Sequence, residues 1–169
     1  LILASNVFAH ADDLKSMAEC MKSLVKTNGT IIVEVQYLMN TLKDLTFDNI
    51  YHEHTNYWSL TSLKKFFENL NCQIFKAERI NTHGGSLRIY VSKNKKVKYD
   101  KSVKKLLTEE EKFGIKKIST YMNINSYDFE SIQSMFLAKS GGEVSEKWHK
   151  TPIQLTTERR GKPDVMTII

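Results

Sequence analysis

The first 36 residues, LILASNVFAHADDLKSMAECMKSLVKTNGTIIVEVQ, decide the fold. The apolar run 1–7 predicts a buried strand, and Asp12 and Asp13 supply the carboxylates that often begin a helix. The next apolar residues recur at three- and four-residue spacing, and the same side takes in Cys20: Leu14, Met17, Ala18, Met21, Leu24 and Val25. Asn28-Gly29 ends this helix, and 30–36 predicts a strand covered on both faces. A strand, a helix and a strand with short connections predict a parallel pair with a right-handed crossover.

The residues up to 92 add a helix and two strands to this unit. Thr61–Leu70 predicts a short helix with Thr61 as its cap, whereas 37–60 shows no regular period. Cys72–Ile80 and Ser86–Ser92 predict strands. The short glycine turn between these strands implies antiparallel pairing. The first half is therefore predicted to be α/β with an antiparallel hairpin at one end.

Three parts are expected along the chain: a domain at 1–92, a helical extension at 93–140 and an irregular tail at 141–169. Tyr99–Ile124 predicts one long helix with these apolar residues inward: Val103, Leu106, Leu107 and Phe113. Tyr127–Ser140 predicts a second helix, and glycines and prolines interrupt any period after it. Lysines between 93 and 117 alternate with Glu109, Glu110 and Glu111, a pattern typical of a solvated helix surface and not of a nucleic-acid footprint.

Composition is that of a globular protein, with 169 residues, 41% hydrophobic, 26% charged and a net charge of +6. No apolar run reaches the roughly 20 residues of a membrane span, and no signal peptide is recognisable. Cys20 and Cys72 lack motif spacing, which favours free thiols in a reducing, cytoplasmic setting. The chain opens directly on an apolar strand, so we expect sequence upstream of it.

Acid–base chemistry is concentrated in three short motifs. Tyr51-His52-Glu53-His54 places two imidazoles, a carboxylate and a phenol within four residues. The others are the turn His83-Gly84-Gly85-Ser86 and the segment Asn6–His10, which ends the first apolar run with an amide and an imidazole. This density of polar groups predicts an enzyme active site equipped for proton abstraction.

These motifs, in this order, resemble the S-adenosylmethionine-dependent C-methyltransferases that act on nucleotide-linked 4-keto sugars. The matching pieces are NVFAH at 6–10, FDNIYHEH at 47–54, YWSL at 57–60 and HGGSLR at 83–88. The resemblance implies the C-terminal half of a class I, Rossmann-like methyltransferase sheet, with helices and an irregular tail after its hairpin. It also implies the strand order first, second, fourth, third, with the first strand at an exposed edge.

Other parts of that family have no counterpart here. They are the cysteine-built zinc module, the glycine-rich cofactor loop and the ribose-binding acid, which precede the matched region, and the recognisable second lobe, which follows it. The sequence therefore predicts a fragment whose parent binds S-adenosylmethionine. We expect the isolated chain to bind this cofactor weakly and to be inactive.

C-methylation beside a ketone requires a positioned base and a donor that stabilises the developing enolate oxygen. His54 and Tyr51 are the candidate bases, and Glu53 is placed to orient an imidazole or contact the substrate. His10 follows a parallel strand at the end where α/β sheets bind ligands, so it is a candidate donor to the enolate oxygen. Asn6 is a candidate for the same role or for contact with the cofactor.

Further candidates for contact with substrate or cofactor are His52, His83, Gly84 and Ser86. For each the alternative is a structural role, since polar groups near a core usually find partners. His83 fits a turn equally well, the two glycines suit backbone geometry, and Tyr57 and Trp58 suit packing. Five of these side chains are of types that bind metal ions, but their spacing lacks a zinc pattern, so no metal is predicted. They are His10, His52, Glu53, His54 and His83.

The sequence is compatible with three functions. The leading one is a catalytic segment of a C-methyltransferase whose partner is a nucleotide-linked keto sugar. The second is a truncated remnant without catalysis, and an upstream reading frame would separate these two. The third, a basic nucleic-acid-binding module, is supported by charge alone.

Overall fold

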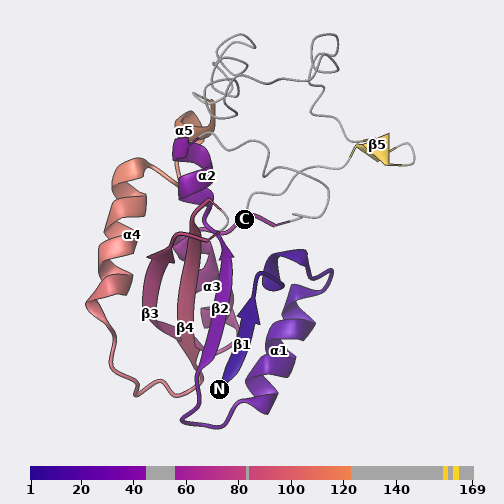
Figure 1. Cartoon of the computed structure of the whole chain (residues 1–169), viewed down its shortest axis with the longest axis vertical. Coiled ribbons are helices and arrows are strands. Elements are labelled where there is room, and N and C mark those ends of the chain that lie inside the picture. The colour runs from indigo at the N-terminus through magenta and orange to yellow at the C-terminus, as the bar shows by residue number, and fades with distance from the viewer. Residues whose placement is uncertain (45–55, 83, 123–157, 160–161, 164–169) are drawn as a thin grey trace. The chain divides into compact units, whose positions relative to one another are not determined.

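A computed structural model describes residues 1–44, 56–82, 84–122, 158–159 and 162–163. Its main sheet contains β1 (Ile2–Ser5), β2 (Ile31–Gln36), β3 (Gln73–Ile80) and β4 (Ser86–Ser92). The strands lie in the order β1-β2-β4-β3, as the family resemblance implies (Figure 1). The β1–β2 pair is parallel, and β4 is antiparallel to both of its neighbours. The predicted α/β class and its terminal hairpin are therefore confirmed.

Strand β1 is an edge strand of the described sheet, as the resemblance implies, and the expectation of a buried strand from its apolar run is wrong. Within β1 only Ala4 is buried, while Leu3 is 63% exposed. The exposure follows from position, because β1 has one pairing partner among the described residues. Ala4 pairs with Val33, which pairs in turn with Ile89, so the three side chains share the buried face.

Helix α1 (Leu14–Leu24) begins where the sequence predicts and ends earlier. Asp13 caps it by accepting a hydrogen bond from the Ser16 amide, and the helix stops at Val25, ahead of Gly29. Two expectations about its apolar side are wrong, because Cys20 is exposed and Leu24 is 72% exposed. Neighbouring residues on a helix point about 100° apart, so these two turn away from the buried Met21 and Val25.

Two short helices stand at the borders of the region that seemed irregular. Helix α2 (Leu38–Asp44), which the sequence analysis missed, buries Leu38, Met39 and Thr41. Helix α3 (Leu60–Asn69) is capped by Ser59, which forms a capping box with Ser62, so the expectation of Thr61 as the cap is wrong. After β1, the 3-10 helix η1 (Phe8–His10) places Phe8 in the core.

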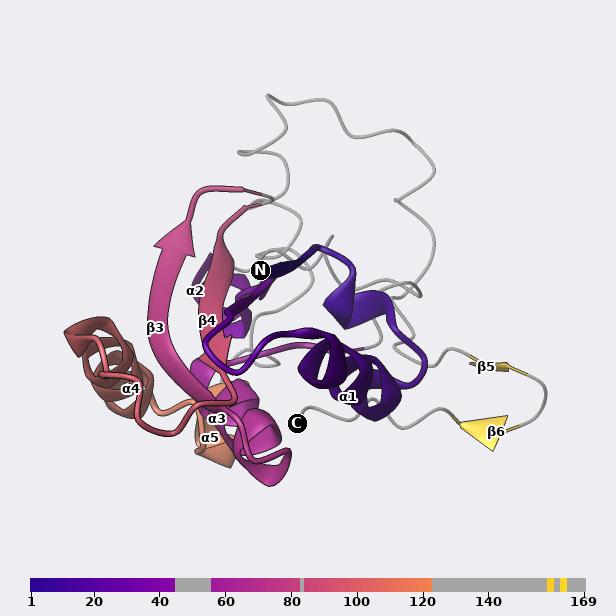
Figure 2. The same cartoon turned by 90° about the horizontal axis from the view of Figure 1, so that it is seen from below.

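The expected long helix at 99–124 is two helices. α4 (Lys101–Phe113) is capped by Asp100 and ends at Gly114, whose φ of 83° is left-handed; α5 (Ile118–Met122) follows. Glycine adopts this conformation without strain, which makes Gly114 a favourable helix end. Figures 1 and 2 place α4 beside β3 and α1 beside β1, at opposite margins of the sheet.

The mixed charge run on α4 is only partly a solvated surface. Its lysines are exposed, but Glu110 is fully buried and accepts hydrogen bonds from Tyr37, Leu60 and Thr61. The expectation of solvation is therefore wrong for Glu110. A carboxylate is stable in such a place only when several donors surround it, and the sequence pattern gave no sign of them.

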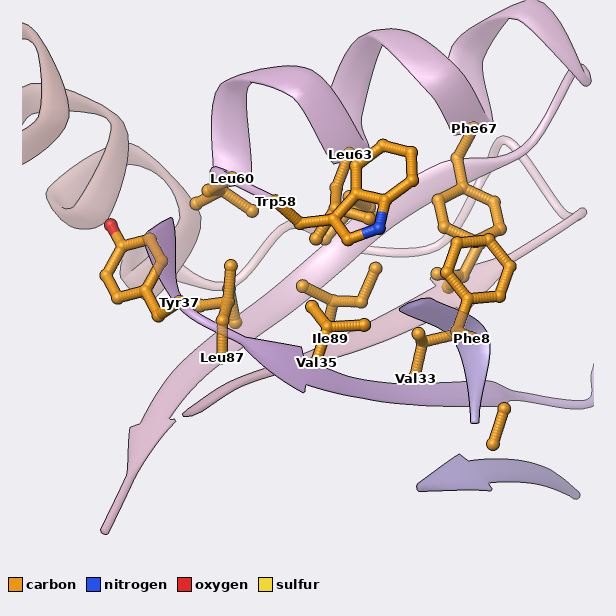
Figure 3. Packing of buried hydrophobic residues seen from close by; sticks show 14 of the residues in the cluster. Phe8, Val33, Val35, Tyr37, Trp58, Leu60, Leu63, Phe67, Leu87 and Ile89 are labelled. Carbon is orange, nitrogen blue, oxygen red and sulfur yellow. The ribbon is translucent and has the colours of Figure 1, made fainter. Parts of the chain in front are cut away.

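The core lies between the sheet and its helices. Figure 3 shows Val33, Val35, Leu87 and Ile89 of β2 and β4 facing Leu63 and other residues of α3, with Trp58 between them. The ring centroid of Phe8 lies 5.8 Å from that of Trp58 and 5.9 Å from that of Phe67. Tyr57 and Trp58 are buried, in agreement with a packing role.

By chain contacts, residues 1–120 with 167–169 form one compact unit and 121–166 another. Of the second unit the structure describes the end of α5 and a two-stranded antiparallel hairpin, β5 (Glu158–Arg159) and β6 (Lys162–Pro163). The helix expected at 127–140 lies outside the described residues. Among those described, no helix has the length and apolarity needed to span a bilayer.

Phe8→Ala should lower the free energy of unfolding by about 3–5 kcal/mol, because it removes a fully buried ring and leaves a cavity among three aromatic side chains. Urea unfolding followed by circular dichroism measures the change. The neighbouring Val7, which is 50% exposed, is the control, and Val7→Ala should change stability by less than about 0.5 kcal/mol. Equal effects of the two substitutions would contradict this account of the core.

Candidate functional site

Two of the three sequence motifs meet at the carboxyl ends of β1 and β2. The backbone N–H of Asn6 donates to the Glu34 carbonyl at 3.0 Å, and the backbone N–H of Tyr37 donates to the Gly85 carbonyl at 3.3 Å. Asn6 has a φ of 53°, a left-handed conformation that asparagine tolerates better than most residues. The end of the first strand, the end of the second and the glycine turn therefore share one end of the sheet (Figure 1). Ligands commonly bind α/β sheets there.

His10 ends η1 on the exposed surface, four residues beyond Asn6. The structure thus places His10 after the strand and not in it, on the same connection as Asn6. Its expected role as a donor to an enolate oxygen stays a prediction. Tyr51, His52, Glu53, His54 and His83 lie outside the described residues.

The segment that carries the tyrosine–histidine motif has its two ends side by side. Tyr37 and Trp58 form a parallel β-bridge, and the Leu38 amide donates to the Trp58 carbonyl at 2.9 Å. The ends of this segment therefore lie at the carboxyl end of β2, beside Gly85. This was not evident from the sequence, because Trp58 belongs to no regular element.

Gly85 is required by its surroundings as well as by its conformation. Its φ is 110°, and a Cβ built on it would lie 2.1 Å from Nδ2 of Asn40 in α2. Gly84 also has a positive φ, of 74°. These values agree with the backbone role considered for both glycines. Ser86 is fully buried, and its hydroxyl donates to the Thr82 carbonyl at 3.0 Å, so this side chain braces the turn.

Glu34 is a site residue that the sequence analysis missed. It is 4% exposed, and its Oε2 accepts from Nε and Nη2 of Arg88 at 3.2 and 3.0 Å. Its Oε1 accepts from the Thr82 hydroxyl at 3.0 Å, which ties the turn to β2. The Glu34 carboxylate raises the pKa of Arg88 above its ordinary value. Two features of the sequence could have indicated this pair. One is a carboxylate inside an apolar strand, and the other is an arginine in β4, where apolar and polar residues alternate.

A second charged group continues along the same face of the sheet. The Tyr90 hydroxyl donates to Oε1 of Glu78 at 2.5 Å, and the Lys76 ammonium lies 3.2 Å from Oε2 of the same carboxylate. The Tyr90 hydrogen bond is the main reason that the pKa of Glu78 lies below its ordinary value, and Lys76 and Arg88 add to the effect. This face therefore carries a row of paired charges beside the turn.

Among the described residues no group of three or more His, Cys, Asp or Glu side chains is placed to hold a metal ion. Most of the imidazoles weighed as metal ligands lie outside that part of the chain. For S-adenosylmethionine the fit is partial. Asn6 offers an amide at the ligand-binding end of the sheet, whereas β1, the edge strand, has no described strand beyond it that could carry an adenosine-binding loop.

Comparison with known proteins finds matches to two family models and to a curated relative. Residues 1–77 match a family model described as a methyltransferase domain, and residues 81–137 match one described as a C-methyltransferase C-terminal domain. The chain is also 34% identical over 92 residues to the C-methyltransferase NovU of Streptomyces niveus. That match covers 54% of this chain and 22% of the relative. The four-stranded α/β sheet is consistent with a partial class I methyltransferase fold.

Gly85→Ala should lower the free energy of unfolding by about 1–3 kcal/mol, because alanine at this φ is strained and its Cβ meets Asn40. The double variant Asn40→Ala/Gly85→Ala separates the two causes. It removes the amide that collides with the new methyl group, so Gly85→Ala should cost less in the Asn40→Ala background than in the native chain. Urea unfolding of the four proteins gives both values. An alanine that is tolerated in the native background would refute the close approach.

Tyr90→Phe should raise the pKa of Glu78 towards its ordinary value, measured by NMR titration of the labelled carboxyl carbon. A carboxyl whose folded pKa is depressed stabilises the fold above its unfolded pKa, and this stabilisation is lost as the pH falls through the folded value. Below about pH 4 the native protein should therefore lose stability more steeply than Tyr90→Phe. Parallel acid titrations of stability would contradict the role of this hydrogen bond.

Proposed function

We propose that this chain is part of an S-adenosylmethionine-dependent C-methyltransferase that methylates a carbon beside the ketone of a nucleotide-linked sugar. The observation that carries the proposal is the convergence at one end of the sheet. Asn6, the glycine turn and both ends of the tyrosine–histidine segment meet there. The two family matches, which meet near residue 80, and the similarity to NovU support transfer of a methyl group to carbon.

In this proposal some residues of the chain remove a proton and others stabilise the charge that develops. His54, or Tyr51 three residues before it in sequence, takes the proton from the carbon next to the ketone, and the electron pair moves onto the ketone oxygen as an enolate. His10 or Asn6 donates a hydrogen bond to that oxygen, and Glu53 orients the imidazole. The carbon then forms its bond to the methyl group. S-adenosylmethionine, when bound, would supply that methyl from its sulfonium sulfur, which keeps the electron pair of the broken S–C bond and leaves as a neutral thioether.

Further residues at this end of the sheet are assigned to binding. His52, His83 and Gly84 contact the substrate or cofactor in this proposal, and Ser86 acts by shaping the turn beside them. The Glu34–Arg88 pair holds the turn against β2 through Thr82. Substrate recognition therefore depends on a turn fixed by internal hydrogen bonds, which keeps its donors in place before the substrate arrives.

In the full-length polypeptide that carries this chain, His54→Ala and Tyr51→Phe should each lower turnover more than they raise the KM for substrate. A base acts mainly in the transition state, and its loss costs on the order of 10²–10⁴ in rate. Exchange of the substrate proton for deuterium, followed by NMR without a methyl donor, isolates the proton step. His149→Ala, which removes a histidine outside the three motifs, is the matched control and should exchange at the native rate. If both base variants exchange as fast as the native enzyme, neither residue is the base.

A further inference from the structure

We propose that Glu110 is a positioning residue that holds together the two ends of the segment 38–57, a role that rests on the proposed function of that segment. Glu110 lies on α4, more than fifty residues beyond the tyrosine–histidine motif in sequence. It is fully buried and belongs to none of the three sequence motifs. The part of the chain that contains it matches the C-methyltransferase C-terminal domain.

The carboxylate uses both of its oxygens. Oε1 accepts from the Tyr37 hydroxyl at 2.9 Å and from the Leu60 amide. Oε2 accepts from the Thr61 amide at 2.9 Å and from the Thr61 hydroxyl at 2.6 Å. Four donors from two separate parts of the chain therefore converge on one side chain, and hydrogen bonds of this kind to a charged group are short and strong.

The residues that carry these donors flank the segment on both sides. Tyr37 directly precedes it, and Leu60 and Thr61 follow its end as the first two residues of α3. The Tyr37–Trp58 bridge joins the two ends through the backbone, and Glu110 joins them a second time through side chains. Fixing both ends of a segment restricts the conformations open to the chain between them, and by this restraint Glu110 would act on the candidate base of the proposed function.

The electrostatics support a role in geometry more than one in bulk stability. Glu110 lies at the N-terminus of α3, where the helix dipole favours an anion. Burial, and then the Glu110 charge, raise the pKa of Tyr37, so the phenol stays protonated and donates. The Arg79 guanidinium lies 5.2 Å from the Tyr37 ring centroid and pairs with Glu109 at 2.8 Å. Replacing a buried ion by well-packed apolar residues often leaves the stability of a core unchanged, whereas in some proteins a buried charge specifies one arrangement of the chain. The second role is the one proposed for Glu110.

The test compares Glu110→Gln and Tyr37→Phe with Glu111→Gln in the full-length polypeptide. Glu111 is the matched control, because it lies next to Glu110 on α4, is exposed and loses the same charge. Glu110→Gln replaces an acceptor oxygen with an amide that opposes the donors of Leu60 or Thr61. Tyr37→Phe removes one donor of four and keeps the ring, so it serves even if Glu110→Gln fails to fold.

Turnover per folded molecule is the readout that a merely structural role would leave unchanged. We expect turnover to fall about 10- to 100-fold in Glu110→Gln and several-fold in Tyr37→Phe, with the KM for the methyl donor within about twofold of native, as for a misplaced catalytic group. Glu111→Gln should match the native protein. Native turnover per folded molecule in both variants would overturn the proposal.

Backbone amide exchange, measured by mass spectrometry, tests Glu110 without any substrate. Peptides from the two described ends, α2 and residues 56–61, should exchange at least about tenfold faster in both variants, while peptides from β2 and β4 remain protected. Uniform acceleration along the whole chain would instead mark Glu110 as a general stabiliser and would overturn the positioning role. If the native polypeptide exchanges no proton on any keto sugar, the proposed function fails, and amide exchange still decides whether Glu110 holds the segment.

Discussion

The buried carboxylate of Glu110 is the constraint on which the arrangement of the helices depends. An ionised group with no solvent exposure is tolerated only where donors meet it on every side, because its desolvation otherwise costs several kcal/mol. Helix α4, the start of α3 and the end of β2 must therefore come together in one geometry. A shift of α4 by one helical residue would turn Glu110 by about 100° and leave four donors without their acceptor.

The Glu34–Arg88 pair plays a comparable part on the other face of the sheet. It joins β2 to β4 at paired positions of the register, and Thr82 extends it to the turn that precedes β4. A slip of one residue would turn Arg88 to the core face and expose Leu87 or Ile89. The apolar core and the charged pair thus favour the same register, and agreement between independent interactions is what makes a fold specific.

The proposed function at this end of the sheet would depend on both of these constraints. One fixes the turn that carries the glycines, and the other fixes the ends of the segment that carries the tyrosine–histidine motif. The proposed chemistry needs both, because a base and a donor to the enolate oxygen must reach the same small substrate. In the proposed function, rigid elements would supply the frame, and the connections at the carboxyl ends of the strands would supply the reacting groups.

The sequence by itself determined the elements with a strong local period and the direction in which they pair. The apolar runs at 1–7 and 30–36 indicated strands, the helix stripe between them and the alternation in β4 follow from burial of one face, and the short glycine turn requires antiparallel strands. The family resemblance added the strand order. Only the tertiary structure decided which polar residues are buried. Glu110 resembles its exposed neighbours in sequence, and Glu34 resembles a solvent-facing residue, because their donors come from strands and helices about fifty or more residues away. The same reason explains α2 and the exposure of Cys20 and Leu24, since a local pattern shows which residues share a face but not how much of that face a neighbouring element covers.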